Sequence, residues 1–338
     1  MDEINIRIDS DDREEEKIPL KTSSEIKTSS EIVFESQDDY PTTDFLENLT
    51  LHQISKEFTE FSAQNRTLII PVGFPQAGKS LFLSSLMYYA RKGEDVLFRT
   101  FLENDFPFDK GRKAVDSMIN YFDSGKLYDS TQTGTMDLIG ITIEPAKPKL
   151  PLLKLAFLDL AGEDLKKIKT SENSAFTEKI NAVFNGLKVD DSPVIFTLIT
   201  PFEPAKMDNE NQRDAHNRED ALHYDFLNYI KQNQPHILKN SRFFIVVSQW
   251  DKNPDEDLNV EDFIREKRPS IYAAVKNTTV VWGQYSVGKL LVSNVNGVNV
   301  QEIVRINYDY PSRFWKALYQ ICTQKDLDAK SWWERIFG

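Results

Sequence analysis

The stretch GFPQAGKS at residues 73–80 constrains the fold of this chain more than any other. It matches the pattern G-x-x-x-x-G-K-[ST], with an apolar run at 67–72 before it and an apolar-periodic run at 81–90 after it. This order predicts a strand, a phosphate-binding loop (P-loop) and a helix. Glycines let successive backbone N–H groups face phosphate oxygens, and the helix N-terminus adds its dipole to the anion site.

The P-loop also predicts how each side chain would hold a nucleotide. Lys79 is expected to reach the β- and γ-phosphates and to act in catalysis, and the Ser80 hydroxyl is expected to ligate magnesium. The residues of this stretch that should contact the nucleotide are Gly73, Gln76, Ala77, Gly78, Lys79, Ser80 and Leu81.

Composition narrows the class of protein. The 338 residues are 40% hydrophobic and 12% aromatic, which favours a globular body with a buried core. A net charge of −12 argues against nucleic acid as the main partner, because such binding depends on clustered Lys and Arg. The single cysteine, Cys322, excludes an internal disulfide and fits a reducing compartment. With no signal-peptide pattern and no apolar stretch of membrane-spanning length, we expect a cytoplasmic protein.

Changes in composition divide the chain into three segments. Residues 1–43 are acidic and poor in large apolar side chains, with the sequence KTSSEI repeated at 21–26 and 27–32, and we expect a disordered tail. Residues 44–325 are expected to form one nucleotide-binding domain with an insertion at 94–130. Residues 326–338 form an aromatic C-terminal tail, the one segment from which membrane contact is expected to be possible.

Apolar runs and helix-like segments alternate along the central domain. Strands are predicted at 66–72, 96–101, 194–199, 243–247 and 278–285, and the strands at 136–143 and 152–158 are predicted to pair as a hairpin. The polar stretch 203–220 is expected to be an exposed loop before a helix at 221–232, and another helix is expected at 260–275. Asn296-Gly297 predicts a second hairpin, and Pro311 the start of a C-terminal helix. This alternation implies a mostly parallel sheet with helices on both faces and a ligand site at the carboxyl ends of the strands.

Three further elements follow predicted strands. Asp159 ends an apolar run, where a carboxylate can hold magnesium, and Gly162 could offer its N–H to a γ-phosphate. A second D-x-x-G at 137–140 lies within a predicted strand and is interpreted as a decoy. Ser248-Gln249-Trp250-Asp251 places a carboxylate where it can accept hydrogen bonds from the N1–H and the amine of guanine, a pair that adenine lacks. Near Ser286 and Val287, after the next strand, a backbone N–H could bond the guanine carbonyl.

Together these four elements, in this order, resemble the Ras-like superfamily of P-loop GTPases over about residues 66–324. The resemblance implies a three-layer α/β fold with a six-stranded, mostly parallel sheet in which one strand is antiparallel. The hairpin around Asn296-Gly297 and the C-terminal helix are expected in addition to this fold. It also implies GTP or GDP as ligand and Mg²⁺ as cofactor. The sequences DLAGE at 159–163 and YSVG at 285–288 are similar to the bacterial double-GTPase families of conflict and defence systems. Those families imply a protein partner, either an effector or an activating subunit.

The chain departs from the superfamily pattern at two places. The base-reading motif normally has Asn or Thr and then Lys, where this chain has Ser248 and Gln249. Glu163 occupies the position at which the superfamily often has a water-positioning Gln. A carboxylate can orient or deprotonate water, but it adds negative charge near the γ-phosphate, so hydrolysis is expected to be slow without a partner. Glu163 as a solvated residue without a catalytic role is the alternative.

Two roles remain open between several residues. The switch threonine that contacts magnesium should precede the strand at 136–143, and Thr131, Thr133 and Thr135 all qualify; we favour Thr133, in a catalytic and metal-binding role. Arg99 or Arg112 of the insertion could supply an arginine in cis, although a surface or structural role is the expectation for each.

Three functions therefore stay open at the level of the sequence. The first is a magnesium-dependent GTP-binding switch that hydrolyses GTP, and the second is a P-loop ATPase or a small-molecule kinase. The third is a nucleotide-binding scaffold without turnover, in which the two tails act as docking segments. Competition between GTP and ATP separates the first two, and phosphate release separates both from the third.

Overall fold

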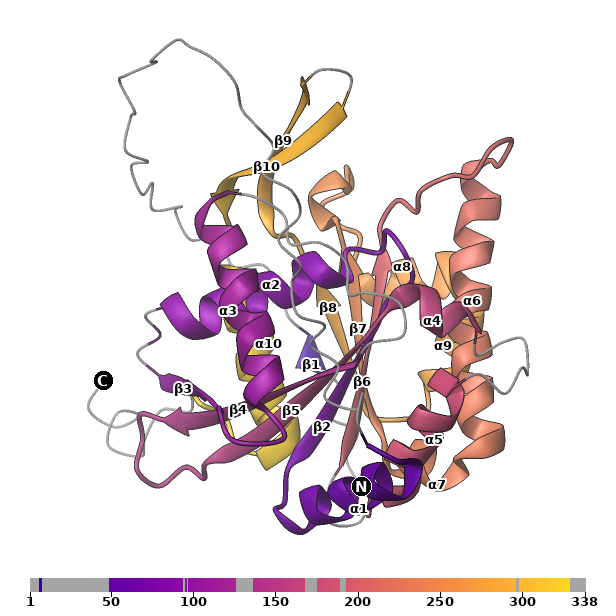
Figure 1. Ribbon diagram of the computed structural model, residues 1–338. Coiled ribbons are helices and arrows are strands. Elements are labelled where there is room, and N and C mark those ends of the chain that lie inside the picture. Colours follow the sequence, from indigo (N-terminus) through magenta and orange to yellow (C-terminus); the bar gives the residue numbers. More distant parts are fainter. Residues whose placement is uncertain are drawn as a thin grey trace, which may run out of the picture.

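The chain folds into a twisted sheet with helices on both faces (Figure 1). The computed structural model describes residues 6–7, 49–93, 95, 97–125, 136–167, 175–188, 193–295 and 298–328. The strands of the main sheet are β1 (Ile6–Arg7), β2 (Thr67–Val72), β3 (Phe98–Leu102), β4 (Met136–Pro145), β5 (Leu153–Leu160), β6 (Val194–Pro201), β7 (Arg242–Ser248) and β8 (Val280–Gln284). The helices are α1 (Leu51–Ala63), α2 (Lys79–Lys92), α3 (Asp109–Asp123), α4 (Gly162–Lys167), α5 (Ala175–Gly186), α6 (Gln212–Asn233), α7 (Pro235–Asn240), α8 (Val260–Lys267), α9 (Pro269–Val275) and α10 (Asp309–Thr323).

The order of the strands is β1–β8–β7–β6–β2–β5–β4–β3. Only β4 runs against its neighbours, because it pairs antiparallel with both β5 and β3, while every other pair in this sheet is parallel. The expected fold class, a mostly parallel α/β sheet with one antiparallel strand, is confirmed. The sheet is two strands wider than the six expected: β3 of the insertion lies outside β4, and β1 lies outside β8.

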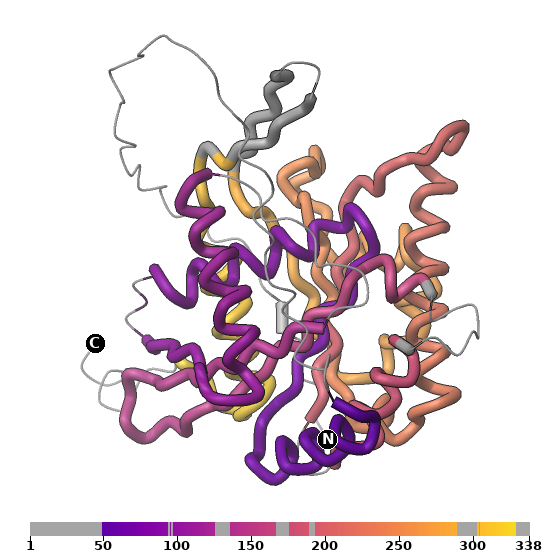
Figure 2. The backbone as a smooth tube through the Cα atoms, in the orientation of Figure 1, coloured from indigo at the N-terminus to yellow at the C-terminus, as the bar shows by residue number. Residues whose placement is uncertain are grey.

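Each face of the sheet carries its own hydrophobic core. Leu68, Ile70 and Val72 of β2 belong to a core shared with α1, α5, α6, α8 and α9, whereas Ile69 belongs to a second core shared with α2, α3 and α10. Figure 2 shows the backbone in the same orientation, with the helices that cover the two faces on opposite sides of the sheet. All six residues of β2 are buried, as in a parallel strand that is covered on both faces.

Pro71 lies inside β2, although proline cannot donate a hydrogen bond to a neighbouring strand. β2 pairs with β6 as far as Val72, but its pairing with β5 ends at Ile69. The proline therefore occupies the part of the strand that has a paired neighbour on one side only. The P-loop begins two residues later.

The first helix starts later than the sequence predicts. A helix from about Asp44 to Glu60 is expected, and residues 44–48 lie outside the described part of the chain. α1 begins at Leu51, after Thr50, whose side chain accepts the backbone N–H of Gln53 while the Gln53 side chain accepts the N–H of Thr50. This capping box satisfies N–H groups that a helix start leaves without partners and so fixes where the helix begins.

The expectation of an exposed loop at 203–220 is wrong for its second half. α6 begins at Gln212, and Asn211 caps it by accepting the N–H of Asp214 at 3.0 Å. Glu219 and Asp220 are only 3% and 5% exposed, instead of solvated. Their charges lie near Arg218 and Arg268, which explains how a sequence of such high polarity can form a packed helix.

The helix expected at 260–275 is interrupted. Arg268 has φ −138° and ψ 55°, outside the helical region, and separates α8 from α9. Pro269 explains the break, because a proline disfavours helical geometry at the residue before it. The break places the Arg268 side chain in the interior, where it is 0% exposed.

The C-terminal part of the described chain contains the second hairpin and α10. β9 (Gly288–Val295) and β10 (Val298–Ile306) pair antiparallel with Val295 opposite Val298, as the Asn296-Gly297 signal predicts, although those two turn residues lie outside the description. α10 buries Trp315 and Tyr319 completely. Burial raises the pKa of the Cys322 thiol, on the same helix, to about 12, so it stays protonated at neutral pH. The aromatic tail from 329 onward also lies outside the description.

Candidate functional site

The P-loop connects the carboxyl end of β2 to the first turn of α2. Gly78 has a left-handed backbone with φ 83°, and directly afterwards α2 begins at Lys79. The Ala77 N–H donates to the Phe74 carbonyl at 3.0 Å, which closes the turn, and the Phe82 N–H donates to the Gly78 carbonyl at 2.8 Å. A left-handed residue ahead of a helix start directs several N–H groups toward one point, which is the geometry of an anion site.

The end of β5 brings a carboxylate to the lysine of this loop. The Lys79 ammonium donates to Asp159 Oδ1, and the two side chains are 6% and 1% exposed. Asp137 of the decoy motif lies opposite Asp159 in the β4–β5 register, within β4 as expected. β2 and β5 are parallel neighbours, so their carboxyl ends meet at one edge of the sheet and the two motifs share one site.

Gly162 packs directly against the P-loop backbone. A Cβ atom at this position would lie 2.8 Å from the Gly73 carbonyl oxygen and 3.1 Å from the Pro75 nitrogen. No side chain other than hydrogen fits there without displacing backbone. The start of α4 is therefore held against the first half of the P-loop by close packing.

The predicted base-reading residues also lie together. Ser286 Oγ donates to Asp251 Oδ1 at 2.9 Å and so orients a carboxylate that is otherwise exposed. Trp250, 9% exposed, anchors the loop by packing its ring against Phe202 and Phe263, and its backbone N–H donates to the Tyr285 carbonyl at 3.2 Å. The segments after β7 and β8 thus form one unit with its carboxylate facing outward.

Ser248 joins this base loop to the P-loop. Its hydroxyl donates to the Ala77 carbonyl at 2.7 Å and lies 3.5 Å from the Thr200 carbonyl at the end of β6. The Ser248 hydroxyl also lies close to the backbone of Gly78, since a Cβ on that glycine would be in ordinary van der Waals contact with Ser248 Oγ at 3.5 Å.

The remaining predicted residues fall into three groups. Ser80 and Leu81 lie half-buried in the first turn of α2, Gln76 is exposed with φ 69°, and Val287 is buried. Glu163 is exposed at the start of α4 and forms a surface ion pair with Lys166 at 3.2 Å. Thr131, Thr133 and Thr135 lie outside the described residues.

Neither arginine considered for a role in cis contacts the P-loop through a described side-chain interaction. Arg112 donates to the Leu102 carbonyl at 3.3 Å and pairs with Asp116 one turn along α3. Arg99 is exposed on β3, opposite Glu144 in the register. Both positions fit the structural or surface role expected for them.

The residues present fit a magnesium site of the nucleotide-dependent kind. The described residues contain no group of three or more His, Cys, Asp or Glu side chains that could hold a metal ion by themselves. Mg²⁺ is commonly held by one or two protein oxygens together with water and substrate phosphates. Ser80, at the N-terminus of α2, and the buried carboxylate of Asp159 supply oxygens of this type beside the P-loop.

A cluster of buried polar residues next to the P-loop was not predicted from the sequence. His223 is 0% exposed, donates its Nδ1–H to the Glu219 carbonyl (2.9 Å) and packs edge-on against Phe74 of the P-loop with ring centres 4.8 Å apart. Burial lowers the pKa of His223 to about 4, and burial together with the charge of Arg268 lowers that of His216 to about 4. The available signal was the spacing of His216, Glu219, Asp220 and His223, which places them on one face of a helix.

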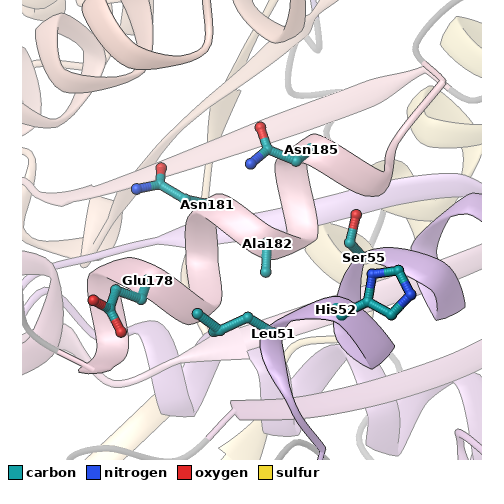
Figure 3. Close-up of a pocket in the computed structure, with 7 residues that line it drawn as sticks. All are labelled: Leu51, His52, Ser55, Glu178, Asn181, Ala182 and Asn185. Atoms are coloured by element: carbon teal, nitrogen blue, oxygen red, sulfur yellow. The ribbon is translucent and has the colours of Figure 1, made fainter.

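A cavity of about 380 Å³ lies between α1 and α5, away from these loops (Figure 3). It is lined by Leu51, His52, Ser55, Glu178, Asn181, Ala182 and Asn185. Asn181 also accepts hydrogen bonds from Tyr229 and Gln234, which ties α5 to α6. We assign this cavity to helix packing, because all of its lining residues belong to α1 and α5.

Known proteins resemble this chain in fold and in sequence. Two solved structures of Toc33 from Arabidopsis thaliana are similar: a dimerization-deficient mutant (13% identity, TM-score 0.36, covering 81% of this chain and 93% of that one) and a complex with Mg²⁺ and GMPPNP (12%, 0.34, 83% and 96%). No curated protein matches this sequence. In the described part of the chain no helix has the length and apolar character needed to cross a membrane. The sequence profile of the family described as Double-GTPase 1 matches residues 70–298, which is most of the chain and includes Asp159, Gly162 and Asp251. The protein therefore belongs to that family of GTPases.

Proposed function

We propose that this protein binds GTP with Mg²⁺ and hydrolyses it slowly, as a switch whose conformation depends on the γ-phosphate. The observation that carries the proposal is the meeting of Lys79 and Asp159 beside Gly162, which itself packs on the P-loop. Residues for the phosphates, the metal and the γ-phosphate thus lie within one contact network, and Asp251 with Ser286 lies at the same edge of the sheet.

Each residue has a defined part in this proposal. Lys79 donates to the β- and γ-phosphate oxygens, and the N–H groups of Gly78 and its neighbours surround the phosphates. Ser80 and Asp159 hold Mg²⁺, directly or through water, and the metal neutralises charge that develops on the phosphates. Gly162 offers its N–H to the γ-phosphate, and Asp251 accepts from the N1–H and the amine of guanine.

Hydrolysis requires attack of water on the γ-phosphorus and cleavage of its bond to the oxygen that bridges to the β-phosphate. GDP and inorganic phosphate are the products. Glu163 is the residue proposed to orient or deprotonate that water. Its exposed position and its ion pair with Lys166 support slow turnover in the isolated chain, because such a side chain is not held in one orientation.

Because hydrolysis by the isolated chain is proposed to be slow, we also propose a protein partner that orders the segment after Asp159. Thr133, outside the described residues, is the proposed switch threonine, and its segment together with 162–170 would be ordered by the γ-phosphate and released on hydrolysis. The partner would be an effector or an activating subunit, and we propose a bacterial conflict or defence system as the setting.

The test is nucleotide binding by the Lys79→Ala protein. We expect this substitution to weaken binding of a fluorescent GTP analogue by at least about a hundredfold, since it removes a charged donor to two phosphates (about 1.5–3 kcal/mol for each hydrogen bond to a charged group). Lys92→Ala, at the far end of the same helix and 46% exposed, is the matched control and should bind like the parent. GTP binding by Lys79→Ala with the affinity of the parent would show that the P-loop assignment is wrong.

Two measurements separate the alternatives. If ATP competes with GTP at equal concentration, the protein is an ATP-using enzyme of the P-loop type instead. If GTP binds but phosphate release stays at the rate of Lys79→Ala, with and without candidate partners, the protein is a nucleotide-binding scaffold.

A further inference from the structure

The buried guanidinium of Arg268 lies behind the candidate site and contacts the strand that supports it. Arg268 Nε donates to Thr200 Oγ1 at 2.9 Å, and Nη2 donates to the Pro201 carbonyl at 3.2 Å. Arg268 and Thr200 are both 0% exposed. Arginine is rarely buried completely, and a planar fork of donors fixes the geometry of what it binds.

The guanidinium is held in place from the opposite side by α6. Its Nη1 contacts His216 Nδ1, which must accept, because arginine can only donate. The charges of Glu219 and Asp220 compensate the buried cation. The Asp220 carboxylate also accepts the backbone N–H groups of Ser270 (3.0 Å) and Ile271 (2.9 Å), which fixes the start of α9 next to Arg268.

The end of β6 that Arg268 holds is the end that contacts Ser248. Thr200 and Pro201 lie opposite Val247 and Ser248 in the β6–β7 register, and the Phe202 N–H donates to the Ser248 carbonyl at 2.8 Å. Ser248 Oγ in turn lies 3.5 Å from the Thr200 carbonyl and donates to the Ala77 carbonyl in the P-loop at 2.7 Å. A continuous path of short contacts therefore runs from Arg268 through β6 and Ser248 to the P-loop.

We propose that Arg268 is a positioning residue of the nucleotide site: it fixes the end of β6 so that Ser248 holds the Ala77 carbonyl and, with it, the P-loop in the binding conformation. This inference rests on the proposed nucleotide binding and extends it to a residue that touches no nucleotide. Small displacements of such supporting residues are costly, because binding groups must be held close to their productive geometry.

The competing explanation is that Arg268 has a purely structural role, and Arg66 is the matched control for it. Arg66, at the start of β2, is 6% exposed and forms a bidentate pair with Glu103 at 2.6 and 2.8 Å. It is as firmly held as Arg268, but its contacts are with Glu103, Gln64 and the ring of Phe108, none of which belongs to the P-loop or the base loop. Loss of Arg66 should lower stability without acting through Ser248.

The experiment is a double-mutant cycle in nucleotide affinity, measured on full-length protein below its unfolding transition. Dissociation constants of a fluorescent GDP analogue are determined for the parent, Arg268→Met, Ser248→Ala and the double variant. We expect Arg268→Met to weaken binding about tenfold in the parent but about threefold or less when Ser248 is already Ala, since coupled residues are not additive. Arg268→Lys should recover part of the affinity, and Arg66→Met should have the same small effect in both backgrounds.

A second variant covers the case in which Arg268→Met does not fold. Thr200→Val is nearly isosteric, removes the hydroxyl that accepts from Arg268 and leaves the buried charges compensated, and we expect it to weaken binding about threefold, again only when Ser248 is present. Equal factors in the two Ser248 backgrounds, or no change in affinity, would overturn the role of Arg268. A parent protein that binds no guanine nucleotide would instead overturn the proposed function.

Discussion

Replacement of Gly162 by alanine tests whether close packing of α4 on the P-loop controls the γ-phosphate side of the site. The added Cβ would lie 2.8 Å from the Gly73 carbonyl oxygen, 3.1 Å from the Pro75 nitrogen and 3.2 Å from the Phe74 carbonyl carbon. All three atoms belong to the backbone, so no side chain can rotate away to relieve the contact. Either the P-loop or the start of α4 must move.

The size of the effect follows from these distances. Ordinary van der Waals contact begins near 3.4 Å, so the Gly73 carbonyl and the new methyl group must separate by about 0.6 Å. Overpacking of this kind costs about 1–3 kcal/mol. If the strain falls on the bound geometry, it corresponds to a loss in GTP affinity of about fivefold to more than a hundredfold. GDP, which lacks the phosphate that Gly162 is proposed to bind, should lose less.

Titration of fluorescent GTP and GDP analogues, together with single-turnover phosphate release, measures this difference. Gly283→Ala is the matched control, because Gly283 also lies near the site, in β8, but a Cβ there would meet only the Ile245 carbonyl at 3.8 Å. We expect the control to bind both nucleotides like the parent. If Gly162→Ala keeps the parent ratio of GTP to GDP affinity and the parent rate of hydrolysis, then packing of Gly162 on the P-loop does not govern the γ-phosphate site.

Two further predictions concern the base loop and the buried histidine. Asp251→Asn should weaken GTP binding by about tenfold to a hundredfold, because charge-assisted hydrogen bonds are lost (about 1.5–3 kcal/mol). Ser286→Ala should cause a smaller loss, because it releases the carboxylate that Ser286 orients at 2.9 Å. An equal loss of ATP binding, measured by competition, would contradict a base-reading role. Burial lowers the pKa of His223 to about 4, below the ordinary value near 6.5, so its contribution to stability is present above pH 6.5 and is lost as the pH falls toward 4. Between pH 7 and pH 5, the unfolding free energy measured with urea should therefore fall more for the parent than for His223→Gln, by at most about 1.4 kcal/mol per pH unit. Equal losses in the two proteins would show that His223 does not titrate in this range.

The parts of the site that could be predicted from the sequence are those that a single strand carries. Apolar runs ending in Gly73, Asp159 and Ser248 predict strands whose carboxyl ends meet, because parallel order follows from the alternation with helices. The β4–β5 hairpin could be predicted for the same reason, since both of its strands are regular and separated by a short turn. Each of these inferences needs only local sequence and one rule of topology.

The residues that could not be predicted depend on partners far away in the sequence. Glu219 and Asp220 read as solvated charges because the neighbouring Arg218 is the one nearby partner visible in the sequence, whereas Arg268, about 50 residues later, compensates both charges in the fold. The close approach of Gly162 to Gly73 likewise depends on how two loops meet. β3 was predicted as a strand (96–101) but not as a member of the six-stranded sheet, and β1 lies in the segment 1–43 that was expected to be disordered. Which edge of a sheet such a strand joins depends on the rest of the fold, so local sequence does not show it.

The base loop shows how the departure from the superfamily pattern is accommodated. Gln249 adopts a left-handed backbone with φ 58°, and its side-chain carbonyl accepts from the Lys252 ammonium at 2.8 Å. A lysine charge therefore lies next to position 249, although it comes from three residues later. Because Lys252 is 48% exposed, solvent screens that charge and it contributes little to affinity. In the proposed function, selectivity for the base then depends on Asp251, which Ser286 orients at 2.9 Å, while Ser248 separately joins the base loop to the Ala77 carbonyl of the P-loop.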